Sequence, residues 1–176
     1  MITIQNISKY FENIKALDQI TATIGEGQVF GLIGTNGAGK STLMRTLCGV
    51  LKPDEGTVYI DGEEVFENPS VKQQLFYISD DQYFFTNGTP QDMLKFYLTW
   101  YPDFDRERFS RLTNVLDLDP MRKINTFSKG MKKQLSVLFG ICSGVKYLLC
   151  DETFDGLDPV MRQTVKSLFI QEIETR

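Results

Sequence analysis

Residues 34–42 read Gly34-Thr35-Asn36-Gly37-Ala38-Gly39-Lys40-Ser41-Thr42, and this stretch decides the fold. It matches the phosphate-binding loop, in which a glycine is followed by four variable residues and then by Gly-Lys-Ser or Gly-Lys-Thr. An apolar run of buried-strand length precedes it at Val29–Ile33, and apolar residues recur behind it at helical spacing, at Leu43, Met44, Leu47 and Leu51. The sequence therefore predicts a strand over 29–33, a phosphate-binding loop and a helix, in that order.

The residue types of this loop suit a nucleoside triphosphate. Its glycines let the backbone curl so that successive N–H groups point inward. The helix that begins near Lys40 adds unpaired N–H groups and the positive end of its dipole. Lys40 would reach the β- and γ-phosphates, and Ser41 would place its hydroxyl on Mg²⁺. We therefore expect nucleotide contacts from Asn36, Gly37, Ala38, Gly39, Lys40, Ser41 and Thr42.

Composition and charge exclude several classes of protein. With 176 residues, 41% hydrophobic and 24% charged, the chain is typical of a globular domain of ordinary size. A net charge of −4 disfavours bulk electrostatic binding to nucleic acid or anionic lipid. No apolar stretch approaches the roughly 18 residues of a membrane span, and residues 1–5 lack the features of a signal peptide. We therefore expect a cytoplasmic location and reduced, buried cysteines at Cys48, Cys142 and Cys150.

The order of periodic segments predicts an α/β fold with an antiparallel part at its N-terminal end. Alternating residues predict strands near 2–4 and 20–24, and Asp61-Gly62 predicts a hairpin between strands 57–60 and 63–66. A further short strand is expected at 75–78. Three helices follow, starting near Thr89, Asp105 and Ser128. The last carries Lys129, Lys132 and Lys133, which we interpret as a solvated face.

Two carboxylates follow the buried-strand pattern of Tyr147–Cys150. In phosphate-loop proteins the strand next to the loop ends in an acid that holds Mg²⁺, and ligands collect at the carboxyl ends of parallel strands. Asp151 is therefore predicted to bind the metal, and Glu152 to take a proton from the attacking water. The chain has no histidine, so such chemistry must use carboxylates and metal. The alternative is an exposed Asp-Glu pair in a turn.

Four stretches together resemble the ATP-binding subunit of ABC transporters over essentially the whole chain. They are the loop at 34–42, the region of Asp80, Phe127-Ser128-Lys129-Gly130-Met131-Lys132, and Asp151-Glu152 with Asp155-Gly156-Leu157-Asp158-Pro159. The Ser-Lys-Gly-Met form, with Tyr101–Asp105 upstream, is most similar to bacterial exporters of drugs, peptides and antibiotics.

The resemblance implies a P-loop NTPase fold with a mixed, partly parallel core sheet. The core would comprise residues 1–85 and 143–176, including the N-terminal antiparallel β subdomain, and residues 86–142 would form an inserted helical subdomain. Two copies would face each other head to tail with ATP between them, Lys40 and Ser41 of one opposite Ser128 and Gly130 of the other. Asp158 would lie in the loop that crosses the dimer interface.

Some implied roles compete with simpler ones. Phe11 would stack on adenine, with Tyr10 as the alternative residue and packing of an aromatic loop on the core as the alternative interpretation. Ser128 and Asp158 each suit the N-cap of a helix, whatever their part in a dimer.

The chain departs from the family pattern in three places. Asp80 stands where the family carries a Gln that senses Mg²⁺, so it is a candidate metal ligand whose role in coupling is doubtful. Thr153-Phe154 replaces Pro-Thr after the acids. The family's histidine beyond the glutamate is missing, because the last amphipathic helix runs to Arg176, where the chain stops. We therefore expect a C-terminally truncated cassette, without its final strand and His switch, that binds nucleotide better than it hydrolyses it.

The function implied by the resemblance is an ATPase that uses MgATP to drive export by a separate transmembrane permease. Such a subunit would lie peripherally on the inner face of the cell membrane and would not bind nucleic acid. The rival classes are a non-transport ABC-type ATPase acting on ribosomes or nucleic acid, and a small-molecule kinase or GTPase. The chain lacks the coiled-coil heptads and second cassette usual in the former, and the Asn-Lys-x-Asp motif of a GTPase.

Overall fold

The computed structural model describes residues 1–175, with side chains up to Ile173, so the predicted helix end at Arg176 lies outside the described residues. The chain divides into two compact units, of which the first ends at Leu75 and the second begins at Phe76. The prediction that residues 86–142 form a subdomain inserted into a core of 1–85 and 143–176 stays a prediction.

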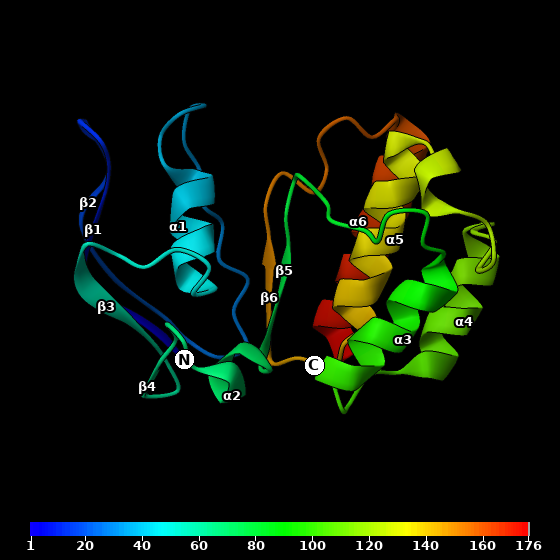
Figure 1. Ribbon diagram of the computed structural model, residues 1–176, viewed down its shortest axis with the longest axis horizontal. Helices are drawn as coiled ribbons and strands as arrows, with labels where there is room; N and C mark the ends of the chain where they lie inside the picture. Colours follow the sequence, from blue (N-terminus) through cyan, green and yellow to red (C-terminus); the bar gives the residue numbers. More distant parts are fainter. Residues whose placement is uncertain (176) are drawn as a thin grey trace. The chain divides into compact units, whose positions relative to one another are not determined.

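The first unit contains a four-stranded antiparallel sheet of order β2-β1-β3-β4 (Figure 1). Its strands are β1 (Ile2–Phe11), β2 (Ile14–Ile24), β3 (Glu55–Ile60) and β4 (Glu63–Glu64). The predicted antiparallel β subdomain is thereby confirmed. Its strands differ from the predicted ones, since β1 and β2 are longer and β4 is shorter.

The sheet follows from alternation and from one turn. On β1, Ile2, Ile4 and Ile7 are buried, and Ile4 lies opposite Ala22 on β2 and Val58 on β3. Asp61 and Gly62 both have positive φ, 50° and 85°. This matches the two-residue hairpin turn that the Asp-Gly sequence predicts.

The predicted buried strand over Val29–Ile33 is wrong for this structure. The segment pairs with no strand among the described residues, and its Val29 and Ile33 are 75% and 96% exposed. Strand backbone is stabilised only when its N–H and C=O groups pair with a neighbouring strand. The sheet of the first unit consists of four paired strands and does not include this segment. An apolar sequence favours strand conformation, but it does not determine which strand, if any, will pair with it.

Helix α1 (Lys40–Leu47) begins where the phosphate-binding loop predicts. Leu43 and Leu47 are buried. The helix ends at Leu47, and Gly49 just beyond it acts as the C-terminal glycine that its position after the periodic residues indicates: its φ is left-handed at 64°, and its N–H donates to Thr46 O at 3.0 Å. A one-turn helix that sequence reasoning did not predict, α2 (Pro69–Lys72), is capped by the Asn68 side chain.

A parallel strand pair joins β5 (Leu75–Ile78), which belongs to the second unit from Phe76 onward, with β6 (Tyr147–Cys150). The Asp151 N–H donates to Ile78 O at 2.9 Å, so the hydrogen bond joins the carboxyl ends of both strands. Figure 1 shows the two strands side by side and running in the same direction. Both strands lie at their predicted positions.

The remaining helices of this unit are α3 (Pro90–Trp100), α4 (Arg106–Val115), the short 3₁₀ helix η1 (Ile124–Thr126), α5 (Lys129–Cys142) and α6 (Pro159–Thr175). The three predicted helix starts, near Thr89, Asp105 and Ser128, are confirmed. The side chains of Thr89, Asp105 and Ser128 accept hydrogen bonds from the backbone N–H groups three residues later. Each cap satisfies one of the amides that a helix start leaves without an intrahelical partner.

Helix α5 is the centre of the second unit's core. It contacts α3, α4 and α6, and Figure 1 shows it in the middle of these helices. Phe139 is fully buried, and its ring centroid lies 4.6 Å from that of Tyr97 and 4.8 Å from that of Phe109. Because so much of α5 is buried against three helices, residues near its N-terminus have well-defined positions relative to the loops around them.

Two further expectations concern the membrane and the cysteines. None of the helices within residues 1–175 combines the length and apolar composition that a membrane span needs. All three cysteines are free thiols; Cys48 and Cys142 are buried, and Cys150 is half-buried. Burial raises the pKa of the Cys142 and Cys150 thiols to about 12, so both stay protonated and unreactive near neutral pH.

Candidate functional site

The phosphate-binding loop between Gly34 and Lys40 closes on its own lysine. The Lys40 ammonium donates hydrogen bonds to Gly34 O and Thr35 O, both at 2.9 Å. The Ala38 N–H donates to Thr35 O at 3.2 Å, which closes a turn inside the loop. The Lys40 ammonium is therefore held against the backbone of the loop, so that an anionic group bound by the loop would lie close to this positive charge.

The backbone of the loop is suited to a polyphosphate. Gly37 and Gly39 have φ values of 82° and 87°, which favour glycine. A Cβ atom at position 39 would lie 2.4 Å from Ala16 O, so the loop passes too close to β2 for any side chain there. The first backbone bond of α1 joins Leu43 N–H to Gly39 O. The first-turn amides of Lys40, Ser41 and Thr42 thus have no intrahelical acceptor and can bind an anion.

The two aromatic candidates for adenine stacking both lie at the end of β1. Phe11 is 44% exposed and Tyr10 is 38% exposed. The Lys9 ammonium lies 5.8 Å from the Phe11 ring centroid, and the Lys15 ammonium 5.5 Å from that of Tyr10. Their exposure argues against the alternative of a loop packed into the core, but it does not distinguish Phe11 from Tyr10, and the role of either ring stays a prediction.

The predicted metal-binding acid is buried and oriented by a tyrosine. Asp151 is 5% exposed, and its Oδ2 accepts a hydrogen bond from the Tyr77 hydroxyl at 2.9 Å. Glu152 is exposed and has a left-handed φ of 46°. The adjacent acids therefore lie in different environments, so the alternative of a plain exposed Asp-Glu pair is wrong for Asp151. Sequence reasoning missed Tyr77, which is 74 residues away along the chain.

Replacing Tyr77 with phenylalanine should lower the free energy of unfolding by about 1.5 kcal/mol, because the buried Asp151 carboxylate loses a hydrogen-bond donor. Tyr59→Phe is a matched control, since the Tyr59 hydroxyl forms no hydrogen bond with a described residue, and it should change stability by less than about 0.5 kcal/mol. Urea denaturation of the three proteins measures the difference. Equal stabilities for Y77F and Y59F would contradict the role of this bond.

Asp80, the other candidate metal ligand, forms an ion pair. Its Oδ1 lies 3.1 Å from the ammonium of Lys133 on α5. The Lys133 side chain is only 13% exposed, so the interpretation of Lys133 as part of a solvated face is wrong. No cluster of three or more His, Cys, Asp or Glu side chains within the described part of the chain could hold a metal ion by itself. The metal role of Asp80 stays a prediction.

The predicted dimer-facing residues cap helices. Ser128 Oγ accepts from Met131 N–H at 3.2 Å. Asp158 Oδ1 accepts from Val160 N–H at 3.0 Å and from Met161 N–H at 2.9 Å, and so caps α6. A Cβ atom on Gly130 would lie 2.6 Å from Met161 Sδ, which shows how closely α5 approaches α6. The N-cap interpretations are thereby confirmed, and contacts of these residues with ATP or a second copy stay predictions.

The candidate site residues belong to two units. Phe11, Lys40 and Ser41 lie in the first, and Asp80, Asp151, Glu152, Ser128, Gly130 and Asp158 lie in the second. Within the second unit, Lys133 brings the segment of Asp80 together with the loop that follows β6. The prediction that Lys40 and Ser41 share a Mg²⁺ with Asp151 and Glu152 stays a prediction.

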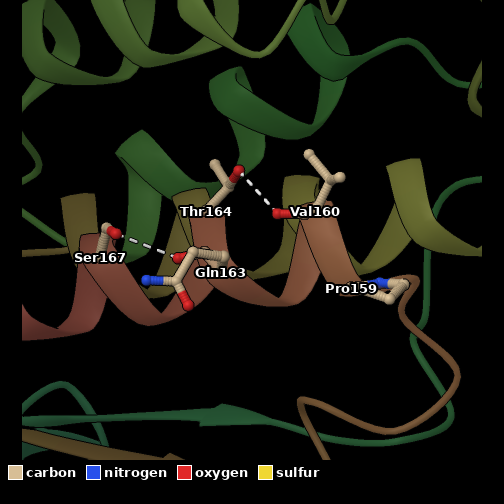
Figure 2. A pocket seen from close by; sticks show the side chains of 5 residues that line it. All are labelled: Pro159, Val160, Gln163, Thr164 and Ser167. Carbon is tan, nitrogen blue, oxygen red and sulfur yellow. Dashed lines mark hydrogen bonds between the residues drawn. The ribbon is translucent and has the colours of Figure 1, made fainter.

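The structure also has a pocket on α6, which none of these candidate residues lines. Figure 2 shows its lining, which consists of Pro159, Val160, Gln163, Thr164 and Ser167. The Thr164 and Ser167 hydroxyls donate to the carbonyls of Val160 and Gln163 on the same helix, at 3.1 and 3.0 Å. Its hydroxyl hydrogens are therefore already used within the helix, and we assign no ligand to this pocket.

Comparison with known proteins identifies one family. A family model described as "ABC transporter" matches residues 17–155. The ABC transporter ATP-binding protein YtrB of Bacillus subtilis (strain 168) is 32% identical over 176 residues, which are 100% of this chain and 60% of YtrB. The probable sulfate/thiosulfate import ATP-binding protein CysA of Chlorella vulgaris is 29% identical over 94% of this chain and 72% of its own length.

Solved structures confirm the predicted fold. A structure described as the ATP-binding subunit of an ABC transporter superposes with a TM-score of 0.86 over 99% of this chain and 75% of that chain, at 23% sequence identity. The fold is therefore a P-loop NTPase of mixed α/β type with an antiparallel β subdomain, as the sequence predicts.

Proposed function

Since the chain belongs to the ABC transporter family, we propose that it is an ATP-binding subunit that binds MgATP and hydrolyses it to drive a separate transmembrane permease. The observation that carries this proposal is the loop at 34–42, where left-handed glycines, free first-turn amides and the Lys40 ammonium form an anion site at the start of α1. The transport partner, the location on the inner face of the membrane and the division into core and helical subdomain belong to the same proposal.

The proposed roles divide between phosphate binding and water activation. Lys40 and the amides of the loop hold the β- and γ-phosphates, while Phe11 stacks on the base. Ser41 and Asp151 would hold Mg²⁺, and the bound ion would neutralise the charge that develops on the phosphoryl oxygens. Glu152 orients the attacking water and accepts its proton.

A second copy of the chain would complete the site. The N-terminus of α5 in that copy presents Ser128 and Gly130, and a helix N-terminus favours an anion such as the γ-phosphate. The Asp158 side chain, which caps α6 in the described chain, would then lie near the junction between the copies.

Purified chain and a fluorescent ATP analogue provide the direct test of nucleotide binding, with released phosphate as the test of hydrolysis. Binding that requires the loop, together with MgATP-dependent phosphate release, is the expected result. Absence of binding at millimolar nucleotide would contradict the proposed function. Preference for GTP over ATP, or transfer of the phosphoryl group to a small molecule instead of water, would favour the rival NTPase classes.

We propose export as the direction of transport, on the support of the Ser128-Lys129-Gly130-Met131 signature and its resemblance to drug and peptide exporters. Several relatives, CysA among them, are named as import proteins and point the other way. In inside-out vesicles that contain the chain and its permease, export predicts ATP-driven accumulation of a transported drug or peptide inside the vesicle. ATP-driven release of preloaded substrate from the same vesicles would show import.

A further inference from the structure

One lysine side chain connects three separate segments of the second unit. Lys133 lies on the second turn of α5, and its ammonium donates hydrogen bonds to Glu152 O at 2.8 Å and Asp155 O at 2.6 Å. The same ammonium pairs with Asp80 Oδ1 at 3.1 Å. It thus links α5, the loop after β5 and the loop after β6.

The environment of Lys133 is that of a fixed group. An ammonium has three N–H donors, and Lys133 has three oxygen partners within hydrogen-bond distance. Only 13% of its side chain is exposed, and a charge so far removed from water is stable only when it is paired and hydrogen-bonded. The Asp80 carboxylate supplies the opposite charge, and the two carbonyls supply the remaining acceptors.

The backbone that Lys133 holds has an unusual conformation. Glu152 is a non-glycine residue with a φ of 46°, a left-handed conformation that persists only when its surroundings determine it. Its carbonyl accepts from both the Lys133 ammonium and the Asp155 N–H, the latter at 3.1 Å. These two donors fix the turn of residues 152–155, and with it the direction in which the Glu152 side chain leaves the backbone.

We propose that Lys133 is a positioning residue for the hydrolytic site, holding Glu152 in its left-handed conformation through the backbone while Asp80 holds the ammonium in place. In this role Lys133 acts on Glu152 through the backbone and takes no part in the chemistry itself. The proposal rests on the proposed function for the role of Glu152, whereas the support of the 152–155 turn stands on the contacts alone. In this proposal Asp80 fixes the Lys133 ammonium, a role that differs from the metal binding expected of Asp80 from the sequence.

Hydrogen exchange tests the positioning without any nucleotide. In Lys133→Met the Asp155 amide, which donates to the carbonyl that Lys133 also holds, should exchange about tenfold faster. Amides in the middle of α5 are the internal reference and should keep their rates. Lys166→Met is the matched control, because Lys166 is exposed on α6 and forms no ion pair with a described residue. An unchanged Asp155 rate in K133M, or equal acceleration of α5 and Asp155, would overturn the proposal.

Kinetics test what the positioning does for the reaction. K133M should lower kcat for MgATP by about 10- to 100-fold, as expected for a displaced reacting group, while KM and the affinity for an ATP analogue change by less than about twofold. Lys133→Arg, which keeps the charge and the donors, should restore kcat in part, and Asp80→Asn should lower it less than K133M does. A K133M enzyme with the kcat of the wild type would overturn the proposal.

The two tests separate this inference from the proposed function. If the wild-type chain binds and hydrolyses no MgATP, the proposed function fails, and the exchange rate of the Asp155 amide still decides whether Lys133 supports the turn. If the wild type is active and K133M is unaffected in both measurements, the proposed function stands and the positioning role fails.

Discussion

Replacing Lys40 with alanine should lower the affinity of the chain for an ATP analogue by about 100-fold or more. The ammonium lies over the loop, 2.9 Å from the carbonyls of Gly34 and Thr35, and would donate charge-assisted hydrogen bonds to the phosphates. Each such bond contributes about 1.5–3 kcal/mol, and about 1.4 kcal/mol corresponds to a tenfold change in affinity. Titration of a fluorescent analogue with Mg²⁺ present measures the loss.

Arg45→Ala is the matched control for this experiment. Arg45 lies on the same helix, carries the same charge and is exposed in its last turn, away from the loop. Its removal should leave nucleotide affinity within about twofold, because exposed charges contribute little at physiological salt. Wild-type affinity in K40A, with R45A equally unaffected, would mean that nucleotide binds elsewhere on the chain.

Replacing Glu152 with glutamine should lower kcat for MgATP hydrolysis by about 100-fold or more, with little change in nucleotide affinity. The substitution keeps the size of the side chain and removes its ability to accept a proton from water, a contribution of about 10²–10⁴-fold for a positioned general base. Single-turnover phosphate release measures the rate even where steady-state activity is low.

Glu107→Gln provides the control for the loss of one negative charge, since Glu107 is 93% exposed on α4. It should hydrolyse MgATP at the wild-type rate. An E152Q protein with the rate of E107Q would show that another group activates the water, and Asp151 would then be the next acid to test.

Most of the structural elements that could be predicted are specified by residues close together in the sequence. The caps at Thr89, Asp105 and Ser128 and the Asp61-Gly62 hairpin depend on residues within a few positions of each other, so the sequence specifies them directly. The strand expected at Val29–Ile33 failed because a strand depends on a partner that its own sequence does not name.

In the candidate site, too, sequence reasoning found the local motifs and missed the contacts between distant residues. The loop at 34–42 and the acids at 151 and 152 could be found because their spacing is fixed by the chemistry of phosphate and magnesium. The hydrogen bond from Tyr77 to Asp151 and the contacts of Lys133 join residues that are distant in the sequence. Nothing in the helical spacing of Lys133 distinguishes a solvated lysine from one that is held by a carboxylate and two carbonyls.

The close approach of position 39 to Ala16 has a consequence for how the gene can vary. Every amino acid that a single base change can produce from a glycine codon carries a Cβ atom, and such an atom would start 2.4 Å from the Ala16 carbonyl oxygen. At Gly37 the φ is equally left-handed, yet a Cβ there meets nothing within 4 Å, and aspartate, which a single base change can give, can adopt that conformation. Among naturally occurring alleles, residue 39 should therefore always be glycine, whereas a substitution of residue 37 can be accommodated without a steric clash.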